Sequence, residues 1–168
     1  KVIGNQVIFS GCDLSHVRKS GVNLDAWDGY PYEQQLITNF LHDKEIENTI
    51  FVTGDTHSSW AFETRLNKEA YAENGTAVAV EFGTTSVSSP TQGTNRPHEQ
   101  VIFGEQMMME HNPHLKYANF RDNGYIILTL TENEAIAEWY YVETVKAASK
   151  EEYLAKQIFV GKGSHVLN

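Results

Sequence analysis

The sequence lacks features that mark several classes of protein. It contains one cysteine, Cys12, so an intramolecular disulfide is excluded and the redox compartment is left open. No apolar run approaches the length of a membrane-spanning helix, and no stretch has the pattern of a signal peptide. Basic residues are few, 13 against 22 acidic ones, which gives a formal net charge of -9. This charge disfavours binding to a nucleic-acid backbone or an anionic membrane, although bound metal ions would reverse its sign locally.

The residues that are present suit one domain with a sizeable core. The 168 residues are 40% hydrophobic and 11% aromatic, enough for a single domain or for half of a larger one. The first ten residues, "KVIGNQVIFS", have the composition of a strand already under way, and no initiator methionine precedes them. We therefore expect this chain to be a piece of a longer polypeptide.

Hydrophobic periodicity and turn residues predict alternating strands and helices. Helices are expected where apolar residues recur every three or four positions, or where charged residues are interspersed with alanine: from 31 to an end between 43 and 47, 58–72, 97–110 and 146–157. Strands are expected in the β-rich runs: 1–10, 49–53, the start of 76–90, and 114–120, with a hairpin at 124–145 around "TENE". This order predicts an α/β or α+β fold, with helices flanking a mixed sheet and a C-terminal β-hairpin.

In the stretch "TIFVTGDTHSSWAF", residues 49–62, Asp55 and His57 lie where a predicted buried strand ends and a loop begins. Ligands of α/β sheets bind beyond the carboxyl ends of strands. An aspartate and a histidine separated by one residue can project the same way from an extended backbone and share a metal ion. Without other motifs, the simpler explanation is preferred: a turn-forming aspartate and a histidine bonded to the backbone.

Further motifs occur in a fixed order along the chain. They are "GNQV" at 4–7, "WDGYP" at 27–31, "TGDTHSSWA" at 53–61, "VAVEFGTTSVSSP" at 78–90, "NPHLKY" at 112–117, and "NGYIILTLT" at 123–131 followed by "AEWYYVETV" at 137–145. In these segments the chain resembles the carboxy-terminal part of the PhoD-like alkaline phosphatase D family, within the calcineurin-like metallophosphoesterases. The resemblance runs from Lys1 to about Val145. It implies that residues 1–145 are the C-terminal part of the phosphatase domain and that residues 146–168 form a helical or extended tail.

The resemblance also implies a fold and a chemistry. The fold would be half of a four-layer αββα sandwich, and the reaction would be metal-dependent hydrolysis of phosphate esters. Asp55 and His57 would be metal ligands and catalytic residues, and Fe³⁺ with Ca²⁺ is the expected metal pair. The family's earlier ligand motifs are absent from this sequence, so we expect an N-terminal half to act as the partner and the isolated fragment to be inactive. The family implies a periplasmic or secreted location.

Five other residues are candidates for supporting the metal ligands or the substrate rim: Asn5, Asp28, Tyr30, Glu81 and His114. Asn5 can instead bond a neighbouring loop, and Asp28 can cap the helix that follows it. Glu81 lies in an apolar strand, where an unpaired charge is costly, so it needs either a buried partner or an exposed edge. His114 can orient a ligand or the leaving group, or serve a structural role. A non-catalytic binding or structural module that keeps the sandwich fold is the alternative to the phosphatase.

Overall fold

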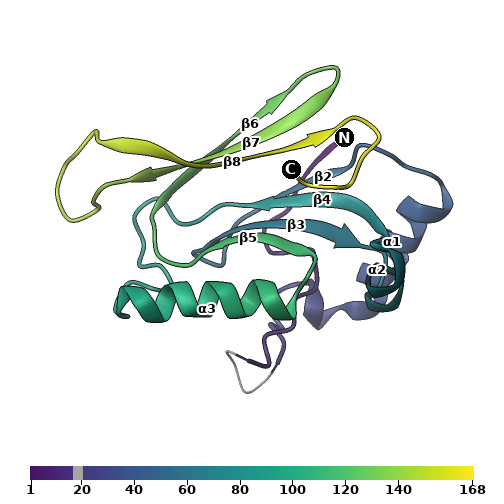
Figure 1. The fold of residues 1–168 in the computed structure, drawn as a ribbon, viewed down its shortest axis with the longest axis horizontal. Helices are drawn as coiled ribbons and strands as arrows, with labels where there is room; N and C mark the ends of the chain where they lie inside the picture. Colours follow the sequence, from purple (N-terminus) through teal and green to yellow (C-terminus); the bar gives the residue numbers. More distant parts are fainter. Residues whose placement is uncertain (17–20) are drawn as a thin grey trace.

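The structure is a computed structural model that describes residues 1–16 and 21–168 (Figure 1). Its elements, in chain order, are β1 (Val2–Gly4), the 3-10 helix η1 (Trp27–Gly29), α1 (Pro31–Asp43), β2 (Ile50–Thr53), β3 (Ser59–Arg65), α2 (Lys68–Asn74), β4 (Ala77–Gly83), α3 (His98–His111), β5 (Leu115–Asn119), β6 (Gly124–Leu130), β7 (Glu134–Val142) and β8 (Glu152–Gly161). None of the α-helices in this described part of the chain combines the length and hydropathy that a membrane crossing needs.

The larger sheet is mixed and has the strand order β1-β2-β4-β3-β5. β1, β2 and β4 run parallel, whereas β3 is antiparallel to both β4 and β5. The carboxyl ends of β1, β2 and β4 therefore meet at one edge of this sheet, which is the edge where α/β proteins bind their ligands. Asp55 and His57 follow β2 at that edge.

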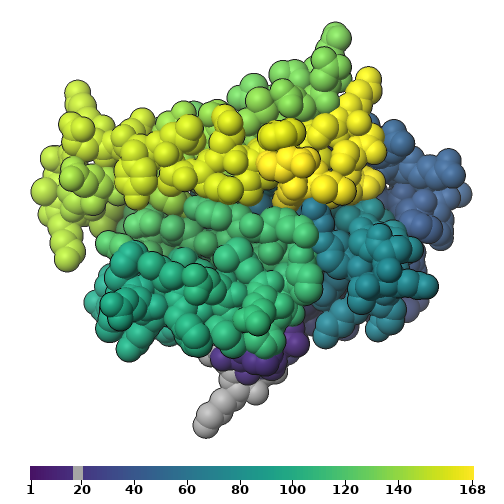
Figure 2. Space-filling view, in the orientation of Figure 1, coloured from purple at the N-terminus to yellow at the C-terminus, as the bar shows by residue number. Residues whose placement is uncertain are grey.

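The smaller sheet is antiparallel, in the order β6-β7-β8. Alternate residues of β7 are buried, as expected for a strand with one covered face. Trp139 of β7 is fully buried, and its indole N–H donates to the carbonyl of Gly83, 3.0 Å away, on the facing sheet. Figure 1 shows this sheet lying against one face of the larger one, and in Figure 2 the residues of β8 run along the top of the molecule.

The helices cover the other face of the larger sheet (Figure 1). Met108 and Val101 of α3 pack against Trp60 and Phe62 of β3. Leu41 of α1 belongs to a second cluster with residues of β2 and β4. The molecule is thus a stack of helices, mixed sheet and antiparallel sheet. The predicted fold class, a mixed sheet flanked by helices with a C-terminal hairpin, is confirmed.

The helix predicted over 58–72 is wrong in its first half. Residues Ser59–Arg65 form β3, a strand hydrogen-bonded on both sides, and six of its seven residues are buried. A strand covered on both faces has no alternation of apolar and polar residues, so the pattern cannot separate it from a buried helix. The helix begins only at Lys68, after Asn67 caps it by accepting the backbone N–H of Ala70, 2.8 Å away.

The helix predicted over 146–157 is also wrong. From Glu152 the chain forms β8, which pairs with β7 along its whole length. β8 is an edge strand, and its first six residues are exposed, so charged and alanine residues occur there without alternation. Only Ile158 and Val160 turn toward the core between the sheets.

Candidate active site

Asp55 and His57 lie in a tight loop at the carboxyl end of β2. Their backbones are left-handed, with φ of 71° at Asp55 and 53° at His57. The expectation of an extended backbone at this point is therefore wrong, and the positive φ falls on the two candidate ligands rather than on Gly54. Aspartate and histidine tolerate this region better than most residues, but it costs about 1–3 kcal/mol where it is strained. The surrounding structure has to hold such a loop in place.

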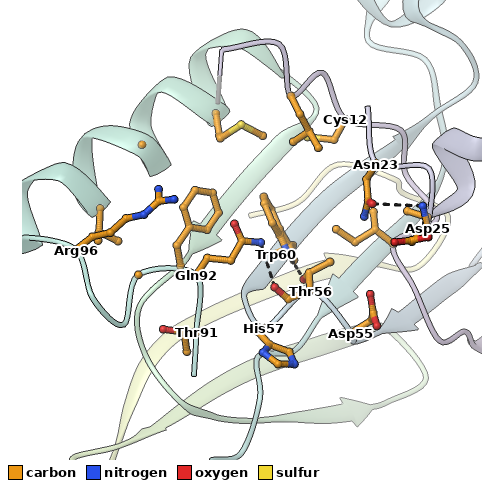
Figure 3. Close-up of a pocket in the computed structure, with 18 of the residues that line it drawn as sticks. Cys12, Asn23, Asp25, Asp55, Thr56, His57, Trp60, Thr91, Gln92 and Arg96 are labelled. Carbon is orange, nitrogen blue, oxygen red and sulfur yellow. Dashed lines mark hydrogen bonds between the residues drawn. The ribbon is translucent and has the colours of Figure 1, made fainter. Parts of the chain in front are cut away.

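Three side-chain hydrogen bonds hold this loop, and two of them reach the segment Pro90–Gln92 (Figure 3). The imidazole Nδ1–H of His57 donates to the carbonyl oxygen of Pro90, 2.8 Å away. Gln92 Nε2 donates to the carbonyl of Thr56 at 3.1 Å, and Trp60 Nε1 donates to Thr56 Oγ1 at 2.7 Å. The loop is thereby held at Thr56, which separates Asp55 from His57, and at His57 itself.

The hydrogen bond to Pro90 decides the tautomer of His57. A carbonyl oxygen only accepts, so Nδ1 of the neutral ring carries the proton and Nε2 keeps its lone pair. Metal-binding histidines characteristically donate their second nitrogen to a carbonyl or carboxylate in this way. Among the described residues, none donates a hydrogen bond to the carboxylate of Asp55, so both of its oxygens stay available. The carboxylate oxygens of Asp55 and the Nε2 atom of His57 are therefore both in a form that can bind a metal ion.

Both side chains line a cavity of about 550 Å³ between the sheet edge and α3 (Figure 3). Carboxylates and neutral imidazoles suit iron and other transition ions, and carboxylates also suit Ca²⁺, so the residues fit the expected metals in kind. They do not complete a site, because no group of three or more His, Cys, Asp or Glu within residues 1–16 and 21–168 is placed to hold a metal. Asp55 and His57 alone would be only part of a ligand set.

Glu81 lies in the middle of β4, fully buried, and does not line the cavity. Its carboxylate accepts the backbone N–H groups of Phe9 at 2.9 Å and Ser10 at 2.6 Å, and the hydroxyl of Thr53 at 2.8 Å. Burial raises the pKa of Glu81, and these donors counteract that effect. The buried partners expected for this residue are thus present. Through Thr53, Glu81 also fixes the end of β2, two residues before Asp55.

Asp28 lies at the cavity wall, where it accepts the backbone N–H of Cys12 at 3.2 Å. Burial raises the pKa of Asp28, and Arg65 lowers it. The alternative that Asp28 caps the following helix is wrong, because α1 has no side-chain cap.

Asn5 and Tyr30 do not line the cavity. Asn5 donates to the carbonyl of Val7 at 2.6 Å, and the side chain of Tyr30 is exposed.

His114 is fully buried behind the sheet edge and does not line the cavity. Its Nε2–H donates to the carbonyl of Gly11 at 2.7 Å, so its Nδ1 faces Arg65 Nη1 at 3.4 Å as an acceptor. Desolvation, followed by the charge of Arg65, lowers the pKa of His114 to about 3. These contacts agree with the structural alternative for this histidine.

Sequence reasoning missed most of the residues that line the cavity, among them Trp60, Gln92 and Arg96. Trp60 lies three residues after His57 and was recognised only as part of a motif. Gln92 and Arg96 occur in an irregular loop, where no periodicity or spacing marks them. Their position follows from the long-range packing of residues 84–97 against the end of β2, which no local pattern encodes.

The fold agrees with what comparison with known proteins shows. A protein-family model described as PhoD-like phosphatase matches residues 1–139, and the chain belongs to that family. Alkaline phosphatase D of Bacillus subtilis (strain 168) is 28% identical over 139 residues, which are 82% of this chain and 22% of that protein. A solved structure of PhoD superposes with a TM-score of 0.81 at 22% identity, covering 99% of this chain and 30% of that one. The chain therefore spans less than a third of either relative. The superposition on the solved structure of PhoD establishes the fold.

Proposed function

We propose that this chain contributes the Asp55 and His57 ligands to the active site of a metal-dependent phosphoesterase. The observation that supports the proposal is the hydrogen bond from His57 Nδ1 to the Pro90 carbonyl, which leaves Nε2 of the neutral ring without a proton in a residue that lines the cavity. Family membership supplies the reaction class, hydrolysis of phosphate mono- or diesters. Fe³⁺ and Ca²⁺ are the proposed metals, and a periplasmic or secreted location remains a prediction.

Each residue then has a defined role. A bound metal pair would supply Lewis-acid stabilisation of the phosphoryl oxygens and activate the attacking water. Asp55 and His57 bind, and the Pro90 carbonyl keeps the imidazole in the tautomer that binding requires. Gln92 and Trp60 hold the left-handed loop, so that the ligands are in place before the substrate arrives. The remaining ligands are proposed to come from the N-terminal half of the protein.

The test replaces the ligands in the full-length protein that contains this chain. Asp55→Asn and His57→Gln are expected to lower bound metal and phosphatase kcat/KM by at least roughly a hundredfold, since even indirect disturbance of metal ligands costs that much. The matched control is the exposed pair His42 and Asp43, whose side chains lie 3.2 Å apart at the end of α1. His42→Gln and Asp43→Asn are expected to leave both quantities unchanged.

The alternative is a non-catalytic binding module, which is favoured by the absence of a third ligand among the described residues. It predicts that the ligand variants keep the same metal content as the control variants. That result, measured by elemental analysis of the purified proteins, would overturn the proposed role of Asp55 and His57.

A further inference from the structure

We propose that Glu81 is a positioning residue for the ligand loop, residues 54–58, because its carboxylate ties the start of that loop to another segment that lines the cavity. This wall segment, residues 8–13, follows β1. The inference rests on the proposed function, since it takes Asp55 and His57 as the metal ligands. The groups that donate hydrogen bonds to Glu81 belong to neither ligand, so Glu81 acts through the backbone that carries them.

The carboxylate of Glu81 is shared between the two segments. Its Oε1 atom accepts the hydroxyl of Thr53, directly before the ligand loop, at 2.8 Å, and also the backbone N–H of Phe9 at 2.9 Å. Its Oε2 atom accepts the backbone N–H of Ser10 at 2.6 Å. Because Glu81 is fully buried, solvent does not replace a partner that is lost. Movement of the end of β2 away from the wall segment would therefore leave a buried polar group with an unmade hydrogen bond.

The wall segment forms no helix or strand, yet the rest of the fold holds it along most of its length. Each residue from 9 to 13 has a backbone N–H or C=O bonded to a side chain from a distant part of the chain. A buried network with all its hydrogen bonds made restricts a segment to one arrangement. The wall segment is thus a fixed point to which Glu81 ties the ligand loop. The side chains that hold the wall segment are Glu81, Gln34, His114, Asp28 and Asn112.

The ligand loop needs an anchor where it leaves β2. Asp55 and His57 have left-handed backbones, which persist only where the surrounding structure holds them. The hydrogen bonds to the neighbouring segment, described above, act on the later residues of the loop. At its start, the N–H of Gly54 donates to the carbonyl of Gln6, 3.3 Å away, and Glu81 holds the residue before Gly54. Glu81 thereby keeps the two ligands in place before a metal binds.

A purely structural role is the alternative, in which Glu81 only satisfies buried donors and its loss lowers stability alone. Glu63 of β3 offers the matched control, because it is a second buried glutamate, 5% exposed. It accepts the backbone N–H of Leu167 at 3.0 Å and pairs with Lys116 at 3.3 Å. Neither Glu63 nor these two partners line the cavity. Glu63→Gln should therefore lower stability without changing metal binding.

The tie itself is removed by Thr53→Val, which takes away the hydroxyl and keeps the shape of the side chain. Thr53→Ser keeps the hydroxyl and is the rescue variant. Iron bound to the full-length protein is measured by elemental analysis after equilibration with increasing citrate, a competing chelator of Fe³⁺. We expect the citrate concentration that removes half of the iron to fall about tenfold for Thr53→Val and for Glu81→Gln. Thr53→Ser and Glu63→Gln should stay close to the unchanged protein.

A second measurement does not depend on a metal. Hydrogen exchange is followed in the metal-free full-length protein, with the amide of Gly54 as the reporter. This amide should exchange faster in Thr53→Val than in Thr53→Ser, because the start of the ligand loop is released. Equal exchange in the two variants would show that the hydroxyl does not hold the loop.

The positioning role is overturned if Thr53→Val and Thr53→Ser hold iron equally, or if Glu63→Gln loses as much iron as Thr53→Val. Asp55→Asn separates this inference from the proposed function. If Asp55→Asn loses iron while the two Thr53 variants agree, the positioning role fails and the proposed function remains. If Asp55→Asn loses no iron, the proposed function fails, and exchange of the Gly54 amide decides whether the loop is held. The two Thr53 variants decide the question if Glu81→Gln does not fold.

Discussion

At the scale of single residues, polar side chains buried behind the sheet edge hold the loops that surround the cavity. Glu81 joins Phe9 and Ser10 to the end of β2, and His114 holds Gly11. None of these contacts joins neighbours in sequence, so a sequence pattern indicates that a buried partner must exist without saying which one. The position of Asp55 and His57 at the end of a strand could be predicted, whereas the left-handed backbone that presents them could not.

His114 is expected to make the fold sensitive to acid. Its pKa of about 3 lies below its ordinary value of 6.5, so protons bind the unfolded chain first and stability declines as the pH falls from 6.5 toward 3. The loss from this residue should reach about 3 kcal/mol near pH 4.5. The cationic side chains of Arg65, Lys116 and Lys68 all act in the same direction.

Urea unfolding at pH 7.5 and pH 4.5 checks this expectation. His114→Gln keeps an amide that can donate to the Gly11 carbonyl but cannot take up the proton, so it should lose less stability between the two pH values than the unchanged protein. His42→Gln, at an exposed histidine, should behave like the unchanged protein. An equal loss in the His114 variant would show that another group controls the acid response.

At the scale of elements, amphipathic segments were predictable, whereas β3 and β8 were not. The helix at 31–43 and the hairpin at 124–145 each have one covered face, and both were predicted correctly. β3 is covered on both faces, and the first part of β8 is exposed, so neither shows the alternation that identifies a strand. Their identity is decided by the neighbouring strands with which they pair.

β8 should respond to mutation as a strand does. Ile158 is 3% exposed and faces the other sheet, while Phe159 is 42% exposed on the outer face. Ile158→Ala should cost about 3 kcal/mol of unfolding free energy because it leaves a cavity in the core. Phe159→Ala should cost about 1 kcal/mol or less although it removes more atoms. Chemical denaturation of the two variants measures the difference, and a larger cost at Phe159 would contradict the assigned faces.

At the scale of the whole molecule, two sheets pack through a shared core, and a third layer of helices positions the cavity. The core between the sheets contains the fully buried Ala137 and Trp139, and the hydroxyls of Tyr117 and Tyr141 meet across it at 2.8 Å. The resemblance predicted this class of architecture correctly. The described residues contain no cluster of three metal-ligating side chains, so the proposed chemistry needs ligands from the rest of the protein.

The 168-residue chain alone is expected to show no phosphatase turnover above background when Fe³⁺ and Ca²⁺ are supplied. Catalytic metal sites generally use three or more protein ligands, and the described residues provide Asp55 and His57 only as a pair. Hydrolysis of a chromogenic phosphate ester by the chain, with and without a co-expressed N-terminal part, is the measurement. Strong metal-dependent turnover by the chain alone would contradict the expectation.

The acceptor that orients His57 is a main-chain carbonyl, and this has a consequence for how the site can change. Replacing the side chain at position 90 leaves that oxygen in place, so an alanine scan would pass over the group on which the imidazole depends. The hydrogen bond to the His57 ring would be lost only if the backbone followed a different path. Deletion of one residue between 86 and 90 would cause such a change. The site should therefore tolerate substitution in this loop far better than a change in its length.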